Sequence, residues 1–173
     1  VVAHEFHHAI QMGNYGFFDK DIFYHEITST AMEEFVFPKI DDYINYIRTY
    51  FRNTQKSFCS TIIDDGYSRA VWNLFLREKF GVNIIKSIWE LMPTERAILA
   101  ISDAISGKGS TLKNEFNTFG LWTYFTGIRS IPNKYFDEAA RYPLISPMVL
   151  SGSMTINSEP VSNNFFQYND FTL

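Results

Sequence analysis

Apolar side chains recur with a period of about 3.6 residues along most of the chain, which is typical of amphipathic helices. The pattern is clearest after Pro38, where it predicts a helix through Phe51 with Asp41 and Asp42 in its first turn. The downstream segments end at glycine or proline, residues that terminate helices. The further predicted helices are about 65–80 before Gly81, Asn83 to near Pro93, Thr94 to Gly107, Ser110 to Gly127, and a short one at 135–141.

The residue pattern changes at Pro147, after which Ser, Thr, Asn and Pro dominate. Polar and apolar residues alternate at 153–156, and aromatic residues gather at 165–171, which favours β structure. We therefore expect a mainly α fold with two parts, a helical domain at 1–146 and a β-rich tail or the start of an accessory β-domain at 147–173. The tail is too short for an independent sandwich, so it packs on the helices or belongs to a further domain.

Two helices are also predicted at the N-terminal end. An apolar helical run ends near Met12 and is followed by turn residues, and a second helix is expected from Phe23 to Val36. Asp19 or Asp21 is expected to cap or precede this second helix.

The first of these helices carries the pattern HExxH in His4-Glu5-Phe6-His7-His8. Residues four apart on a helix lie on one face, about 6 Å apart along the axis, so His4 and His8 can bind one metal ion. Glu5 projects beside that face, where a carboxylate can act as general base on a metal-bound water. His7 is expected near the metal ligands or at the surface.

A catalytic zinc held by two histidines needs a third protein ligand and leaves one position for water. Glu26, in the second predicted helix, is the best candidate, and the adjacent His25 is the alternative. Thr30 and Glu33 return to the face of Glu26 and could orient a ligating imidazole, whereas Glu34 is expected on a solvated face.

The segments HEFHHAIQ and HEITSTAMEEFVF resemble the gluzincin zinc peptidases, in which HExxH is followed some twenty residues later by a metal-binding glutamate on the next helix. They are most similar to a group of predicted secreted bacterial metallopeptidases with HExxHxxQ and an EGTATWMEDEV-like segment. Ile27 and Ala31 depart from that group, which usually has Gly and Trp there. The resemblance covers roughly residues 4–36 and implies zinc as cofactor, with His4, His8 and Glu26 as ligands.

The resemblance also implies a zincin-like helical subdomain, hydrolysis of peptide or protein substrates, and a secreted, periplasmic or cell-surface location. The sequence begins three residues before His4, so the zincin sheet and any signal peptide are expected upstream, and the activity of this chain alone is in question. Gluzincins stabilise the oxyanion with a Tyr or His from a later helix. Tyr67 is our candidate, because it opens a predicted helix and follows a flexible glycine, and Arg69 is a weaker alternative.

Composition narrows the class of protein. The 173 residues carry a net charge of −4 with no basic run, which argues against nucleic acid and anionic membranes as partners. No apolar run approaches the roughly 20 residues of a membrane helix. A single cysteine, Cys59, excludes an internal disulfide and is expected to be a small buried apolar residue.

Two other functions stay open from the sequence. The chain could be a non-catalytic or degenerate peptidase-like domain that acts as a binding or accessory module, or it could hold a structural metal with His7 or His25 as fourth ligand. An intact Glu5 argues against both. The sequence leaves the choice between endopeptidase and aminopeptidase, the oligomeric state and the identity of the divalent metal open.

Overall fold

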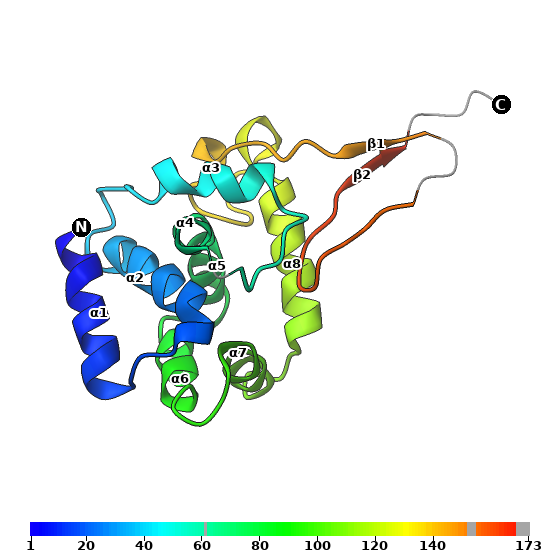
Figure 1. Cartoon of the computed structure of the whole chain (residues 1–173). Helices are drawn as coiled ribbons and strands as arrows, with labels where there is room; N and C mark the ends of the chain where they lie inside the picture. The colour runs from blue at the N-terminus through cyan, green and yellow to red at the C-terminus, as the bar shows by residue number, and fades with distance from the viewer. Residues whose placement is uncertain (61, 152–154, 169–173) are drawn as a thin grey trace.

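The chain is mainly helical with one small sheet (Figure 1). The computed structural model describes residues 1–60, 62–151 and 155–168. The α-helices are α1 Val2–Asn14, α2 Ile22–Val36, α3 Ile44–Arg52, α4 Ile63–Ser68, α5 Val71–Phe80, α6 Asn83–Leu91, α7 Ala97–Ser106 and α8 Leu112–Tyr124. Three 3₁₀ turns, η1 Asp19–Asp21, η2 Gly127–Arg129 and η3 Ala139–Arg141, and two strands, β1 Met148–Leu150 and β2 Phe166–Tyr168, complete the fold.

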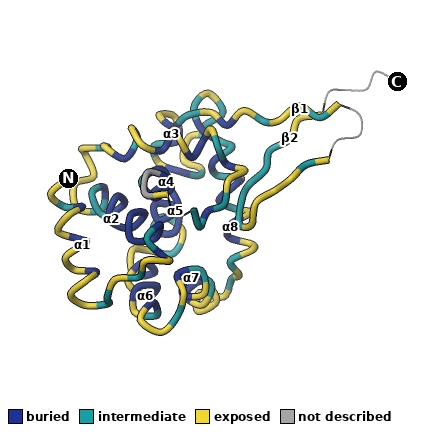
Figure 2. The backbone as a smooth tube through the Cα atoms, in the orientation of Figure 1, coloured by how far each residue is buried: buried dark blue, intermediate teal, exposed yellow. Residues whose placement is uncertain are grey.

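Helix α2 lies inside the molecule, between α1 on one side and α4 and α5 on the other (Figures 1 and 2). Its apolar side chains, such as Tyr24 and Ile27, are fully buried and join the aromatic core around Trp72. Many of its polar side chains are buried as well. Several of them have hydrogen-bond partners, whereas Glu26 Oε2, Thr30 Oγ1 and Glu34 Oε2 make no regular hydrogen bond. Thr28 Oγ1 accepts hydrogen bonds from Asn73 and Trp89, both at 3.2 Å. These internal hydrogen bonds offset part of the cost of burying polar groups in an enclosed helix.

Helix α1 buries a polar face. His4, His7 and Gln11 are its buried residues, whereas Phe6 is 66% exposed and Met12 is 55% exposed. Soluble helices normally bury their apolar side. The contact of α1 with α2 is therefore made largely by polar side chains.

The predicted helix at 65–80 is wrong as a single element. It is divided into α4 and α5 at Arg69, whose backbone leaves helical geometry. The Arg69 side chain is buried, donates to the carbonyl of Ser57 at 2.8 Å and lies 3.5 Å from Asp65. This long-range contact with the preceding loop accompanies the break.

Several predicted helix starts are also shifted. Helix α7 begins at Ala97 rather than at Thr94, because Arg96 is extended and the carboxylate of Asp21 accepts the Ala97 N–H at 3.3 Å. Asp21 thus makes no side-chain cap for α2 and binds Arg96 instead, at 2.7 and 2.8 Å. Helix α8 is capped by Thr111 rather than by Ser110 and ends at Tyr124, before the predicted Gly127.

Two further predictions are too long. The helix expected after Pro38 begins only at Ile44, and Asp41 has a positive φ of 56° in the turn before it. The short helix expected at 135–141 is reduced to η3.

The C-terminal segment forms strands where β structure was predicted, with different boundaries. β1 and β2 pair in parallel, with Met148 opposite Phe166, and project from the helices as an arm (Figure 1). The segment before β2 packs back on the loop between α3 and α4, since Phe58 N–H donates to Val161 O and Asn163 N–H donates to Thr54 O, both at 2.9 Å. The predicted alternation at 153–156 and the aromatic Phe171 fall partly or wholly outside the described residues.

In the part of the chain that the structure describes, no helix combines the length and the apolar character needed to cross a bilayer. The division into domains at residue 146 stays a prediction.

Candidate metal centre

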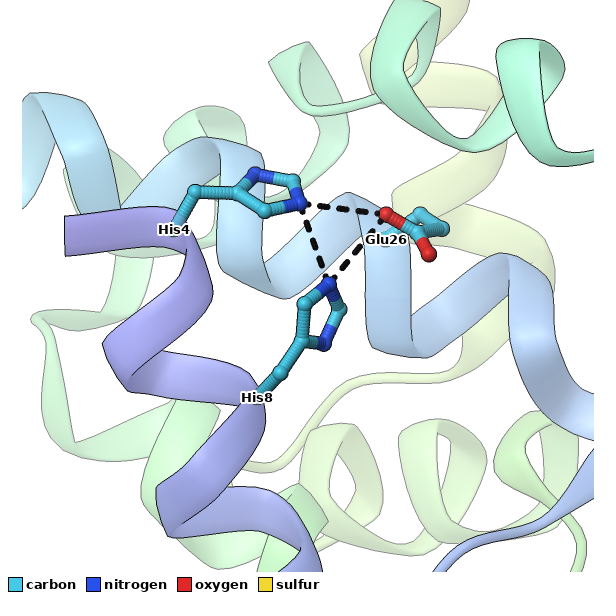
Figure 3. Close-up of side chains that lie close together, drawn as sticks. All are labelled: His4, His8 and Glu26. Atoms are coloured by element: carbon cyan, nitrogen blue, oxygen red, sulfur yellow. Dashed lines mark hydrogen bonds and ion pairs between the residues drawn. The ribbon is translucent and has the colours of Figure 1, made fainter. Parts of the chain in front are cut away.

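Helices α1 and α2 bring the three predicted metal ligands together. His4 and His8 project from one face of α1, and Glu26 projects toward them from α2 (Figure 3). The two Nε2 atoms are 3.0 Å apart, and Glu26 Oε2 lies 3.2 Å from His4 Nε2 and 3.4 Å from His8 Nε2. A tetrahedral zinc with ligands at 2.0–2.2 Å separates its ligand atoms by about 3.3 Å. The triangle therefore has the size of one face of a zinc tetrahedron.

The chemistry of the three groups fits the same ion. Glu26 is 7% exposed, and its Oε2 is buried with no regular hydrogen bond. Burial alone would raise the pKa of Glu26, but the interactions with His4 and His8 outweigh it and lower the pKa to about 2. Glu26 is therefore an anion at neutral pH, as a zinc ligand must be.

A chain of hydrogen bonds fixes the protons on the neighbouring imidazoles. The backbone N–H of Phe18 donates to His25 Nε2 at 3.3 Å, so a neutral His25 carries its proton on Nδ1 and donates to Gln11 Oε1 at 3.1 Å. This orients the Gln11 amide, whose Nε2 donates to His25 O at 3.1 Å and to His7 Nδ1 at 3.0 Å. Gln11 Oε1 then accepts from His8 Nδ1 at 2.8 Å. The lone pair of His8 is thereby left on Nε2, the atom that faces Glu26.

The pKa values of His25 and His7 agree with this assignment. Burial lowers the pKa of His25 to about 4 and the pKa of His7 to about 4, with a smaller contribution from His8 in both cases. Both are neutral at pH 7. The contact with Glu26 raises the pKa of His8.

A cavity of about 470 Å³ opens on this cluster, lined by residues of α1, α2, α3 and α4. His4, Glu5 and Tyr67 all line it, together with Thr30 and Glu33. The Tyr67 ring lies 5.3 Å from the His4 ring, measured between centroids. The two residues predicted to act on substrate thus share one cavity with the predicted metal ligand His4.

Gly66 allows the close approach that places Tyr67. A Cβ on Gly66 would lie 2.5 Å from Glu26 Cβ and 3.2 Å from the carbonyl oxygen of Phe23. The prediction that Tyr67 opens a helix after a flexible glycine is wrong, because α4 begins at Ile63 and Gly66 lies inside it. The glycine is required for close packing against α2 rather than for flexibility.

The alternative ligands lie elsewhere. His7 is buried, with Nδ1 3.0 Å from Ser29 Oγ, and His25 is turned toward Gln11. Among the described residues, the group of ligand atoms that includes both His4 and His8 has three members, the third being Glu26. The fourth position expected of a catalytic zinc is therefore not taken by His7 or His25.

Other expectations need correction. Glu34 is not on a solvated face, because it is 7% exposed. Arg69 is held in the protein interior by Ser57 and Asp65. Thr30 and Glu33 line the cavity, whereas the His8 side chain makes its described hydrogen bonds with Gln11, Ser29 and His4. Cys59 is free and partly buried against the core, close to the prediction.

Sequence reasoning named Gln11 only within HExxHxxQ and missed its role and that of Ser29. Gln11 is three residues after His8 and seven after His4, so its place on the ligand face was a usable signal.

Comparisons with protein-family models, curated proteins and solved structures gave no match. The geometry of the site is accordingly the basis for assigning a function.

Proposed function

We propose that the chain is a zinc-dependent peptidase domain of the gluzincin type, with His4, His8 and Glu26 as the metal ligands. The observation that carries the proposal is the convergence of their three ligand atoms within 3.4 Å at the wall of a cavity. Two histidines and one carboxylate with an open fourth position are the ligand set of catalytic zinc in several peptidases. Helices α1 and α2 then correspond to the active-site helix and the glutamate helix of a zincin fold.

The chemistry follows from the side chains around that cavity. A zinc ion at such a site lowers the pKa of its water to about 7 and polarises a substrate carbonyl. Glu5 is exposed and lines the cavity beside His4, so it acts as the general base that takes the proton from the attacking water and gives it to the leaving amine. Tyr67 lines the same cavity and donates to the carbonyl oxygen as negative charge develops there.

The arrangement favours a catalytic over a structural metal. A closed structural site uses four protein ligands, whereas the described cluster supplies three. The cavity volume of about 470 Å³ is within the usual range for a small-ligand site, and it suits a short stretch of peptide.

The test uses the zinc-loaded chain with a mixture of fluorescence-quenched peptides. We expect cleavage by the wild type, and Glu5→Gln should bind zinc normally while losing activity by about 100-fold or more. Glu90→Gln, an exposed glutamate on α6, is the matched control and should cleave like the wild type. Zinc binding without cleavage by the wild type would support the binding-module function instead, and equal cleavage by Glu5→Gln would exclude Glu5 as the base.

A further inference from the structure

A second cluster of acidic side chains lies at the other end of α2. Glu34 comes from the last turns of α2, Asp41 from the turn before α3, and Glu138 from the residue before η3. One carboxylate oxygen from each lies within 4.8 Å of the other two. Three segments that are far apart in the sequence thus bring negative charge to one point.

Two of these carboxylates have buried oxygens without hydrogen-bond partners. Glu34 is 7% exposed and its Oε2 is buried and unpartnered, and the same holds for Asp41 Oδ1. Such groups are costly to bury unless a hydrogen bond or a cation compensates them. The Glu34 carboxylate points into the cluster and lacks such a partner there.

The described cationic groups compensate only part of this charge. Arg141 Nη1 donates to Asp41 Oδ2 at 2.5 Å and to Glu138 Oε1 at 2.6 Å, and Tyr43 donates its hydroxyl proton to the other oxygen of Glu138. Three ionised carboxylates and one guanidinium leave a formal excess of two negative charges. Burial, followed by repulsion from Asp41 and Glu138, raises the pKa of Glu34 to about 7, although Arg77 and Arg141 act in the opposite direction.

We propose that Glu34, Asp41 and Glu138 bind a calcium ion. Calcium takes six to eight oxygen ligands at 2.3–2.6 Å, from carboxylates, carbonyls and waters, in a flexible geometry. The all-oxygen ligand set argues against zinc, and three protein carboxylates from separate segments suit calcium better than magnesium, which is usually held by one or two carboxylates. A cavity of about 280 Å³, lined by Glu34, Asp41 and Tyr43, gives room for the waters that complete its coordination.

The site is separate from the proposed zinc centre. Glu34 is eight residues after Glu26, which corresponds to about 12 Å along the helix axis, and the two clusters share no ligand. A calcium ion here joins the end of α2 to the Asp41 turn and to the segment before η3. Its loss should therefore reduce thermal stability without removing zinc.

The test is calcium titration of the zinc-loaded chain after calcium has been removed on a chelating resin. We expect one saturable calcium per chain by isothermal calorimetry, a rise in Tm, and terbium luminescence sensitised through Tyr43. Glu34→Gln should weaken calcium binding at least tenfold. Asp103→Asn, which removes an exposed carboxylate on α7 outside this cavity, should change it less than twofold.

The absence of saturable calcium binding, or wild-type affinity in Glu34→Gln, would overturn the proposal. If circular dichroism shows that Glu34→Gln does not fold, Asp41→Asn takes its place with the same expected loss. Binding that persists in Glu26→Ala supports an independent site. Calcium binding that is lost in Glu26→Ala but kept in Glu34→Gln would assign the ion to the zinc centre and overturn the proposal.

Discussion

Replacing Gly66 with alanine tests how α4 positions the metal centre. The added Cβ would lie 2.5 Å from Glu26 Cβ, whereas carbon atoms in contact are normally about 3.5–4.0 Å apart. Helix α4 or α2 must therefore move by on the order of 1 Å. Overpacking of this kind costs about 1–3 kcal/mol, and the better helix propensity of alanine offsets up to about 1 kcal/mol. We expect a net loss of about 1–2 kcal/mol in the free energy of unfolding.

The same movement should displace the carboxylate of Glu26 from the two imidazoles. We expect zinc affinity to fall by about 10- to 100-fold, as it does when groups that orient metal ligands are altered. Gly13→Ala is the matched control, because no heavy atom lies within 4 Å of a Cβ built there and Gly13 is in α1. Chemical denaturation and competition with a chromophoric chelator measure the two effects. Wild-type stability and zinc affinity in Gly66→Ala would refute the close packing of α4 on Glu26.

Three further changes test other parts of the structure. Gln11→Leu should weaken zinc binding about 10- to 100-fold in a chelator competition, because His8 Nδ1 loses the nearer of its two hydrogen-bond partners, Gln11 and Ser29. The exposed Gln55→Leu should have no effect, and equal affinities of the two variants would contradict the hydrogen-bond chain. Asp21→Ala should lower the free energy of unfolding, measured by urea denaturation, by about 1–2 kcal/mol, because it removes the carboxylate that caps α7 and pairs with Arg96. The exposed Asp19→Ala should change the free energy of unfolding little. The pKa of Glu34 is raised from 4.5 to about 7, so the contribution of Glu34 favours the folded state below about pH 4.5 and is lost as the pH rises through 7. In calcium-free buffer, Glu34→Gln should therefore stabilise the protein by on the order of 2 kcal/mol at pH 8 and much less at pH 5. A stability difference that does not depend on pH would contradict this.

The regular helices were the predictable part of the fold. Helix α6 has the predicted boundaries, and α2 nearly so, because their apolar period and end signals are local properties of the sequence. The shifted boundaries depend on distant partners. Asp21 reaches the start of α7 across 76 residues, and Arg69 reaches Ser57 in the preceding loop. No local pattern contains such contacts.

The grouping of His4, His8 and Glu26 was predictable for the same reason. His4 and His8 share a helix face by spacing alone, and Glu26 required only the placement of one neighbouring helix. The burial of Glu34 depends on Asp41 and on Glu138, which is 104 residues later in the sequence. The requirement for glycine at 66 depends on the packing of α4 against α2. Both follow from tertiary contacts, which the sequence of either segment does not reveal.

Zinc stoichiometry tests the central claim most directly. Plasma mass spectrometry on protein purified without a histidine tag, after equilibration with zinc and removal of the excess, should find one zinc per chain in the wild type. Glu26→Ala should lose the ion, whereas Glu33→Ala should keep it, because Glu33 lines the cavity and is outside the three-residue cluster. A wild type without zinc, or a Glu26→Ala variant that keeps zinc at full affinity, would contradict the assignment of His4, His8 and Glu26 as the metal centre.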